Sequence, residues 1–348
     1  MTGSTKTKAK GKAPANPLLA PWRTPFEVPP FEQIKVDHFR PAFDAQFAAN
    51  EAEIESIAGD PAAPTFANTI DALERAGKGL DRVASVFYNL SGTDTTPEMQ
   101  AIEREMAPRF AKHSMQVYQN TKLFKRVDTL LQQRDALGLS QEQGRVLERY
   151  HRSFVRSGAA LDAKSRKRLA AIAEKLASLG TKFNQNVLAD EQSFLMVLEA
   201  GDLAGLPEGV KAAAARLASE RGHDGKYAIS LARSSVESFL QFSSRRDLRE
   251  KAYLAWRQRG ENGGKTDNRA LVKQILALRA ERARLLGFET AAEAALEFSM
   301  AKTPANVRKL LMDVWKPALK RAKQERDDLQ QQVQAEGGNF KLAGWDWR

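Results

Sequence analysis

The sequence predicts a mainly α-helical protein that contains one small pair of β-strands. Apolar residues recur at three- and four-residue steps along most of the 348-residue chain, which is the spacing of one helix face. Only residues 194–198 and 227–231 form short apolar runs of strand length. A short alanine-rich helix, which begins near Val210 and is stopped by Gly222, separates these runs, and we expect the two strands to pair.

Composition narrows the classes of protein to which the chain can belong. It is 42% hydrophobic, and its length allows about two domains with a sizeable core. No apolar run approaches the ~18–20 residues of a membrane span. The absence of cysteine excludes disulfides, cysteine-ligated zinc and a cysteine nucleophile. We therefore expect a cytoplasmic protein with no membrane partner.

The first part of the chain predicts a tail followed by an extended arm. Residues 1–16 are basic and small and have no apolar core of a secretory signal, so we expect a disordered basic tail. Residues 17–43 alternate prolines with aromatic and leucine side chains. Proline blocks regular helix, whereas buried aromatic groups need a surface to pack on. This pattern predicts an arm laid across a helical body that extends to residue 348.

Helical signals dominate from there on. Apolar residues from Ile70 to Leu90 fall on one helix face, and Asn262-Gly263-Gly264 marks a loop. Thr96-Pro97 and Thr303-Pro304 are helix starts, with threonine as N-cap and proline at the first helical position. Other stripes predict helices over residues 99–117, 147–161, 169–187, 247–256, 271–278 and 304–334.

The net charge of +11 favours anionic partners in general, including nucleic acid. The strongest basic stretch is the outer face of the helix that contains residues 164–182, which carries six lysine or arginine side chains. A surface that binds nucleic acid would also need aromatic groups interleaved with these cations. That face has none, so the pattern favours a solvated helix exterior and no nucleic-acid partner.

The four histidines do not form a metal motif. No two of them lie within five residues, which excludes a His-Glu-x-x-His pair. Glu148 and His151 have the spacing of a di-iron helix, but no second such pair exists, so we expect an ordinary surface pair. We expect His38 to make structural hydrogen bonds, His113 to lie on a solvent-exposed helix face and His223 to lie in a turn.

No other catalytic motif is complete. The chain has no Gly-x-Ser-x-Gly elbow, no Walker A pattern and no Gly-x-Gly-x-x-Gly loop after a strand. Ser234-Ser235 and Ser243-Ser244 are predicted to cap helices, and Asp327-Asp328 to be solvated on a charged helix. We therefore predict no catalytic, cofactor-binding or metal-binding residue in this chain.

The end of the sequence is unusually aromatic. Trp345 and Trp347 lie among the last four residues, although chain termini are commonly polar and tryptophan is commonly packed. Phe340 and Leu342 belong to the same apolar pattern, which begins after Gly337-Gly338. We expect the two tryptophans to pack against helices that this chain does not encode, as part of a longer protein.

Several short motifs follow one another in a recognisable order. They are Asn16-Pro17-Leu18-Leu19, Pro29-Pro30-Phe31, His38-Phe39-Arg40-Pro41-Ala42-Phe43, Phe66-Ala67-Asn68-Thr69-Ile70, Phe183-Asn184-Gln185-Asn186, Arg246-Asp247-Leu248-Arg249-Glu250, Met300-Ala301-Lys302-Thr303-Pro304 and Trp345-Asp346-Trp347. Their order resembles the N-terminal half of the thimet oligopeptidase family of zinc metallopeptidases, in particular the bacterial peptidyl-dipeptidase (dipeptidyl carboxypeptidase) branch. Their number and collinearity carry the resemblance, because no single motif is diagnostic.

The resemblance implies a helical clam shell whose two halves face a channel for short, unstructured peptides. In that family, zinc is held by the two histidines of a His-Glu-x-x-His helix and a downstream glutamate, and the glutamate of the motif is the general base. These residues lie C-terminal to the Trp-Asp-Trp segment, so none carries over to this sequence. The implied partners are short oligopeptides, bound through one channel wall, and the missing C-terminal half.

Three hypotheses follow in order of preference. The chain is the N-terminal half of a zinc-dependent oligopeptidase that releases C-terminal dipeptides, in which case it binds no catalytic zinc and is inactive alone. Alternatively, it is a non-catalytic helical module that binds peptides or a partner. The third hypothesis is a nucleic-acid-binding protein that uses its positive charge.

Overall fold

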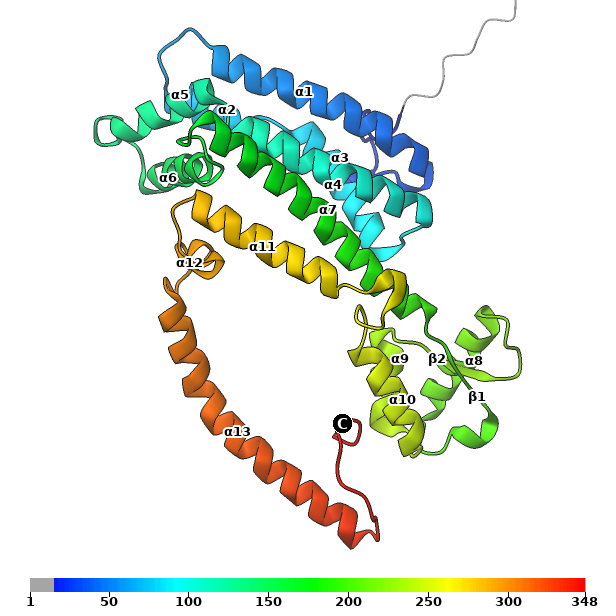
Figure 1. Ribbon diagram of the computed structural model, residues 1–348. Helices are drawn as coiled ribbons and strands as arrows, with labels where there is room; N and C mark the ends of the chain where they lie inside the picture. The colour runs from blue at the N-terminus through cyan, green and yellow to red at the C-terminus, as the bar shows by residue number, and fades with distance from the viewer. Residues whose placement is uncertain (1–15, 348) are drawn as a thin grey trace, which may run out of the picture. The chain divides into compact units, whose positions relative to one another are not determined.

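The computed structural model describes residues 16–347 and confirms the predicted mainly α-helical class (Figure 1). The chain divides into two compact units between Ser178 and Leu179. Except for Asn16, the tail predicted over residues 1–16 lies outside the described residues. Among the residues described, no helix is both long enough and apolar enough to cross a membrane.

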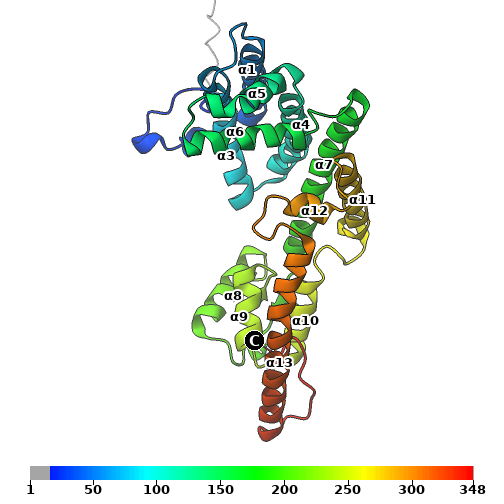
Figure 2. The same ribbon diagram turned by 90° about the vertical axis from the view of Figure 1, so that its left-hand side faces the viewer.

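The first unit is a bundle of helices preceded by the extended arm (Figure 2). Its elements are the 3-10 turns η1 (Pro25–Glu27), η2 (Phe31–Gln33) and η3 (Val36–His38), then α1 (Phe39–Gly59), the π-helix η4 (Phe66–Asp71), α2 (Ala72–Arg75), α3 (Lys78–Thr93), α4 (Pro97–Tyr118), α5 (Thr121–Gln132), the 3-10 turn η5 (Arg134–Ala136) and α6 (Gln141–Arg156). Helix α7 (Ala163–Ser193) begins in this unit and ends in the second.

The arm packs as predicted at its start. Leu18 is fully buried in a cluster with Phe39, Phe43 and Phe87, and the rings of Phe39 and Phe87 meet edge to face at 5.1 Å. The indole nitrogen of Trp22 donates to the carbonyl of Pro17 at 2.9 Å. Further along, the side chains of Phe26 and Phe31 are exposed, whereas those of Ile34 and Val36 pack against the same cluster.

The single helix face predicted from Ile70 to Leu90 is wrong, because the chain breaks at Gly77. This residue has a φ of +80°, which glycine adopts without the steric cost that a Cβ would add. Its amide donates to the carboxylate of Glu53 at 2.7 Å, so a neighbouring helix fixes the break. The apolar spacing continues across this point although the two segments pack in different clusters: Ile70 and Leu73 lie in one, and Leu80, Val83 and Phe87 lie in another.

The predicted caps at the two Thr-Pro pairs are confirmed. The hydroxyl of Thr96 accepts from the amide of Met99 at 3.3 Å, and that of Thr303 accepts from the amide of Asn306 at 3.2 Å. Each side chain satisfies one of the free amides at a helix start. The sequence therefore locates the first turns of α4 and α13 correctly.

The second unit contains the only strand pair among the described residues. Its elements are β1 (Met196–Leu198), η6 (Ala200–Asp202), α8 (Glu208–Glu220), β2 (Tyr227–Ile229), α9 (Arg233–Phe242), α10 (Arg246–Arg257), η7 (Gly264–Thr266), α11 (Arg269–Leu285), α12 (Ala291–Leu296) and α13 (Pro304–Ala335). The strands pair antiparallel, with Val197 opposite Ala228, which confirms the expected pairing. Both strands are shorter than the predicted runs.

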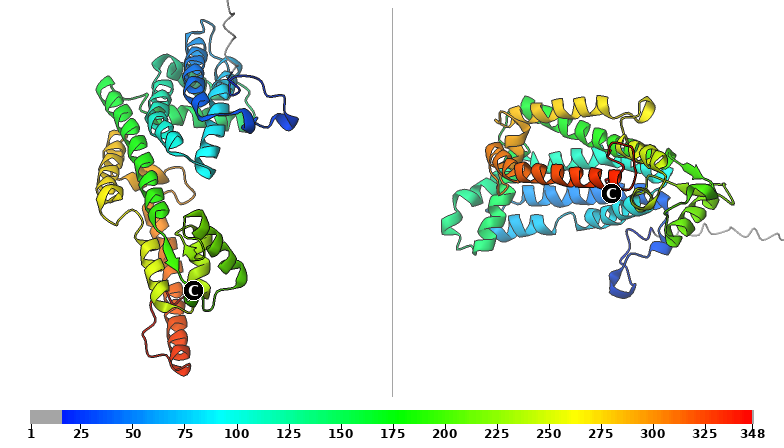
Figure 3. Two further views of the ribbon diagram at one scale, coloured as in Figure 1. Left: turned by 90° about the vertical axis from the view of Figure 1, so that its right-hand side faces the viewer. Right: turned by 90° about the horizontal axis from the view of Figure 1, so that it is seen from below.

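The core of the second unit forms around these strands. Met196 and Leu198 on β1 and Ile229 on β2 pack with Phe239 of α9 and Ala252 of α10. The strand pair and the helices beside it are the green to yellow segments of Figure 3. A two-stranded sheet is marginal alone, so its stability depends on burial against these helices.

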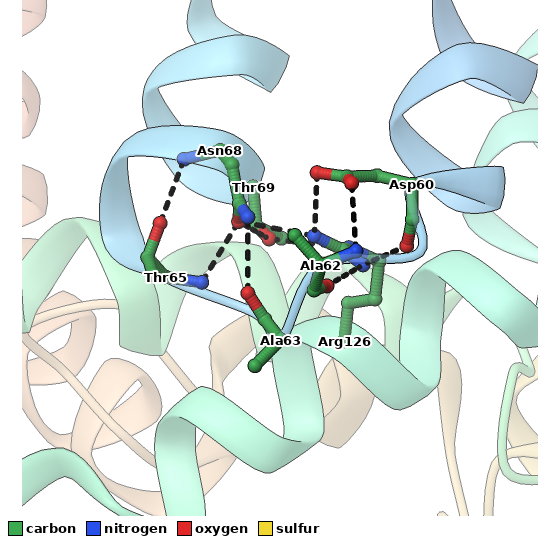
Figure 4. A network of polar contacts seen from close by, with 7 residues as sticks. All are labelled: Asp60, Ala62, Ala63, Thr65, Asn68, Thr69 and Arg126. Carbon is green, nitrogen blue, oxygen red and sulfur yellow. Dashed lines mark hydrogen bonds and ion pairs between the residues drawn. The ribbon is translucent and has the colours of Figure 1, made fainter.

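A buried arginine connects α5 to the loop that precedes η4 (Figure 4). The Arg126 side chain is 8% exposed, and its guanidinium donates to two carbonyls, those of Asp60 at 2.8 Å and Ala62 at 3.0 Å. It also donates to the side chains of Asn68 at 3.0 Å and Thr69 at 3.3 Å, and to the carboxylate of Asp60 at 3.4 Å. These bonds use all five donors of the group, so none is left for a ligand.

The same network explains the Phe-Ala-Asn-Thr motif. Asn68 and Thr65 form a capping box, in which the Thr65 hydroxyl accepts from the Asn68 amide at 3.0 Å and the Asn68 side chain accepts from the Thr65 amide at 2.8 Å. The Asn68 side chain also donates to the carbonyl of Ala63 at 3.0 Å. The motif is therefore a structural element that organises a loop.

The network predicts that Arg126→Lys destabilises the first unit. Lysine keeps the charge but cannot supply donors to five separated acceptors, and about three lost bonds of ~1 kcal/mol each give a loss of about 3 kcal/mol. Urea unfolding of the full chain, followed by circular dichroism, measures this loss. The matched control is Arg145→Lys, an exposed ion-pair partner that should change stability by less than ~0.5 kcal/mol. Equal midpoints for the two variants would contradict the structural role.

Candidate functional site

The histidines occupy four separate structural positions. His38 accepts a hydrogen bond from the amide of Lys35 at 3.1 Å, as expected of a structural residue. His223 is exposed in a turn, also as expected. The expectation for His113 is wrong, because that side chain is buried and its Nε2 lies 2.7 Å from Oδ1 of Asn50. The partner comes from α1, which the spacing within α4 could not reveal.

The Glu148–His151 pair does not form a joint site. His151 is half-buried and its Nε2 lies 3.0 Å from the carboxylate of Asp128 on α5. Glu148 instead pairs with Arg134 and, at 2.8 Å, with Arg145. These arginines hold the pKa of Glu148 below its usual range, mainly through the hydrogen bond from Arg145. The two side chains therefore have different partners.

The serine pairs were predicted to cap helices, and this detail is wrong. The N-caps of α9 and α10 are Ala232 and Arg245, and neither makes a side-chain cap. The hydroxyls of Ser235 and Ser243 accept instead from the amides of Ser230, at 3.1 Å, and Arg245, at 3.2 Å. These two hydroxyl groups stabilise the turns that precede α9 and α10.

The charged helices are solvated where the sequence predicted it. On α7, Lys164, Lys167 and Lys175 are exposed. On α13, Asp327 and Asp328 are exposed, and Asp327 pairs with Arg326 at 2.6 Å. These groups are solvent-facing charges rather than a catalytic cluster.

The described residues do not fit a catalytic zinc. Between residues 16 and 347, no group of three or more His, Asp or Glu side chains is arranged to hold a metal ion. Each of three histidines also has a ring nitrogen engaged with a side chain or backbone amide of the fold. These ring nitrogens therefore serve the packing and hydrogen bonding of the fold.

A groove of about 670 Å³ lies in the first unit, between α1 and the η4–α2 segment. Most of its lining is small and apolar, with Glu53 and Arg75 as its charged groups. Glu53 is already engaged by the amide of Gly77. A catalytic pocket needs several convergent polar groups, and this groove does not bring them together.

The aromatic end of the chain is held by a carboxylate between two arginines of α10. The Asp346 side chain is 4% exposed, and it accepts from Arg249 at 2.7 Å and Arg246 at 2.9 Å. Arg249 also donates to the carbonyl of Trp345 at 3.0 Å. Charge-assisted bonds from two guanidinium groups fix both the position and the orientation of the segment.

The expectation that both tryptophans pack against helices outside this chain is therefore wrong for Trp345. Its ring joins the core cluster of the second unit and meets Tyr253 edge to face at 6.0 Å. The guanidinium of Arg246 lies 5.3 Å from the Trp345 ring and 4.5 Å from the Phe340 ring. Trp347, by contrast, is 40% exposed.

An exposed apolar surface of the second unit lies on α13. Six large side chains of this helix are between 38% and 65% exposed: Leu310, Leu311, Met312, Val314, Trp315 and Leu319. None of the residues of α13 is buried, although the helix has 32 residues. Exposed apolar residues gathered in this way mark interaction surfaces more often than isolated ones do.

Comparison with known proteins places the chain in a family. Residues 239–348 match the family model described as Peptidase family M3. This region contains α10, α13 and the ion pairs of Asp346 with Arg246 and Arg249. The resemblance to the thimet oligopeptidase family of zinc peptidases is thus confirmed, and the chain belongs to peptidase family M3.

Its relatives include the dipeptidyl carboxypeptidase of Escherichia coli, which is 36% identical over 95% of this chain and 49% of its own length. Oligopeptidase A of Salmonella typhimurium is 31% identical over 95% of this chain and 49% of its own length. A probable cytosolic oligopeptidase A of Arabidopsis thaliana is 29% identical over 95% of this chain and 48% of its own length. The chain thus spans about half the length of these relatives.

We predict that the buried His113 makes the first unit less stable in acid. Burial lowers the pKa of His113 below 6.5 and outweighs the attraction of Glu51, whose carboxylate lies 3.7 Å from Nδ1. The unfolded chain therefore binds a proton that the folded chain resists, and stability falls as the pH drops below about 6.5.

Urea unfolding between pH 7.5 and 5.5 measures this effect. His113→Gln should flatten the dependence, whereas the control His223→Gln, at an exposed turn residue, should leave it unchanged. The same slope in both variants would remove His113 as its source.

We also predict that Asp346→Asn releases the aromatic segment. The change leaves two arginines without their anionic partner and should destabilise the second unit by about 3 kcal/mol. Faster proteolysis of residues 336–347, together with an altered Trp345 environment in near-UV circular dichroism, would be the readout. Asp328→Asn, at an exposed position of α13, is the matched control. Equal cleavage rates for the two variants would show that the ion pairs of Asp346 do not hold the segment.

Proposed function

We propose that this chain is the N-terminal half of a zinc-dependent oligopeptidase. The observation that carries the proposal is the match of 95% of this chain to about half of a dipeptidyl carboxypeptidase. In this proposal, the chain supplies one wall of a peptide channel, and the zinc, its ligands and the general base belong to the other half.

The substrates in this proposal are short oligopeptides, from which C-terminal dipeptides are released. The names of the relatives support this class, and identity is higher to the dipeptidyl carboxypeptidase, at 36%, than to oligopeptidase A, at 31%. We further propose a cytoplasmic location, which agrees with the name of one plant relative. The chain alone has no cofactor and no hydrolase activity in this account.

One observation favours the alternative of a non-catalytic partner-binding module. The exposed apolar side chains of α13 suit a protein partner whether or not that partner is catalytic. Nucleic-acid binding has weaker support, because the lysines of α7 are solvated and no aromatic group is interleaved with them on that face.

A covalent fusion tests the proposed function. The full chain is joined at its C-terminus to the C-terminal part of the Escherichia coli dipeptidyl carboxypeptidase, beginning after the matched region. We expect the fusion, supplied with zinc, to release C-terminal dipeptides from an N-blocked short peptide, because it combines a channel wall with a zinc site. Mass spectrometry of the products measures the reaction, and a chelator should abolish it.

Two controls make the outcome specific. A fusion in which the glutamate of its His-Glu-x-x-His motif is changed to glutamine should lose the activity, since that glutamate is the general base. The C-terminal part expressed without this chain should also be inactive. A folded, zinc-loaded fusion that cleaves no peptide would count against the oligopeptidase proposal.

A further inference from the structure

The first half of α13 presents one continuous apolar face. At 3.6 residues per turn, Leu310, Leu311, Val314, Trp315 and Leu319 fall within one side of the helix. Their exposed fractions are 65%, 58%, 60%, 57% and 38%. The opposite side carries charged groups: Lys309, Asp313, Lys316 and Lys320. The helix is therefore amphipathic and its apolar side is uncovered.

This helix is formed and anchored independently of that face. Its first turn is capped by Thr303, and Lys309 pairs with Asp313 at 2.7 Å. Near its end, the side chain of Gln330 donates to the carbonyl of Phe340 at 3.0 Å and accepts from the amide of Leu342 at 2.8 Å. A helix held in these ways offers a preorganised surface, which reduces the entropy lost when a partner binds.

The structure assigns this face to a particular occupant. We propose that the apolar face of α13 is the docking surface for the zinc-bearing half of the oligopeptidase, an inference that rests on the proposed function. Amphipathic helices of 32 residues commonly gain their stability by burying the apolar side, and α13 buries none of its residues within this chain. A protein surface of matching apolar character is required to cover it.

The length of the relatives identifies that occupant. The 333 residues matched in the Escherichia coli dipeptidyl carboxypeptidase make up 49% of its length, so about as much polypeptide again lies outside the match. The family match covers residues 239–348 and therefore includes α13. A second copy of this chain would have to offer the same apolar face to itself, and no observation supports that pairing over the family partner.

The chemistry of the surface also describes the partner. Trp315 and Leu311 lie near the middle of the face and are the side chains best suited to act as anchors, because large apolar groups dominate the energy of protein interfaces. Arg308 lies one turn before these anchors and is exposed. We expect the docking site on the partner to be an apolar groove with an acidic rim.

Binding in trans tests the assignment. The purified full chain is titrated with the separately expressed C-terminal part of the Escherichia coli dipeptidyl carboxypeptidase, and calorimetry gives the Kd. The double variant Leu311→Gln, Trp315→Gln should weaken binding at least about 30-fold, since each anchor contributes more than ~1 kcal/mol. The control Lys316→Gln, Lys320→Gln, on the opposite side, should stay within about 2-fold. Glutamine forms helix well, and circular dichroism verifies that both variants remain folded.

Equal affinity of the two variants would overturn the assigned surface. If the wild-type chain fails to bind and instead forms a dimer that the Leu311→Gln, Trp315→Gln variant disrupts, the occupant is a second copy and the proposal is wrong. The covalent fusion supplies a measurement that does not require the partner to fold alone. Hydrogen exchange of residues 307–320 should be at least about 10-fold slower in the fusion than in the chain alone, and equal exchange would overturn the docking.

These results separate the two proposals. A fusion that cleaves peptides while residues 307–320 exchange as fast as in the chain alone contradicts the docking surface only. A fusion in which those residues are protected but no peptide is cleaved contradicts the proposed function only.

Discussion

The buried carboxylate of Asp346, held between Arg246 and Arg249, is the interaction on which the arrangement of the second unit most depends. It fixes the aromatic segment on α10, and the same segment bonds to Gln330 near the end of α13. Two elements that are far apart in the sequence are therefore linked by polar contacts. A buried carboxylate is stable only where its charge is matched, so this link is specific as well as strong. The Arg126 network has the same role in the first unit, where one side chain organises a loop through five donors.

Much of the fold could be predicted from the sequence because its signals are local. The threonine caps of α4 and α13, the strand runs and the main apolar stripes depend on residues within a few positions of one another. The errors arose where a distant residue decides the outcome. The side chain of His113 is buried beside Asn50 of α1, and the ring of Trp345 packs against Tyr253 of α10. Each partner lies far from its residue in the sequence. The break at Gly77 depends on Glu53 in the same way.

The candidate site could be predicted less well than the fold. The histidine spacing excluded a His-Glu-x-x-His pair, and the structure brings no metal-binding group together within residues 16–347. The sequence also showed that residues 304–334 form a long helix with apolar positions, but whether those positions are covered depends on tertiary packing. The exposed face of α13 therefore emerged only from the structure. Together with a match to about half of each relative, it points to an interface rather than an active site.

In the proposed oligopeptidase, this chain contributes structure and binding surface, whereas the metal centre lies in the other half. Elemental mass spectrometry of the full chain after dialysis against micromolar zinc tests it most directly. We expect well below one zinc per chain, with no difference between the wild type and a variant in which His38, His113 and His151 are changed to glutamine. One tightly bound zinc per chain, lost in that variant and accompanied by chelator-sensitive peptide cleavage, would contradict it.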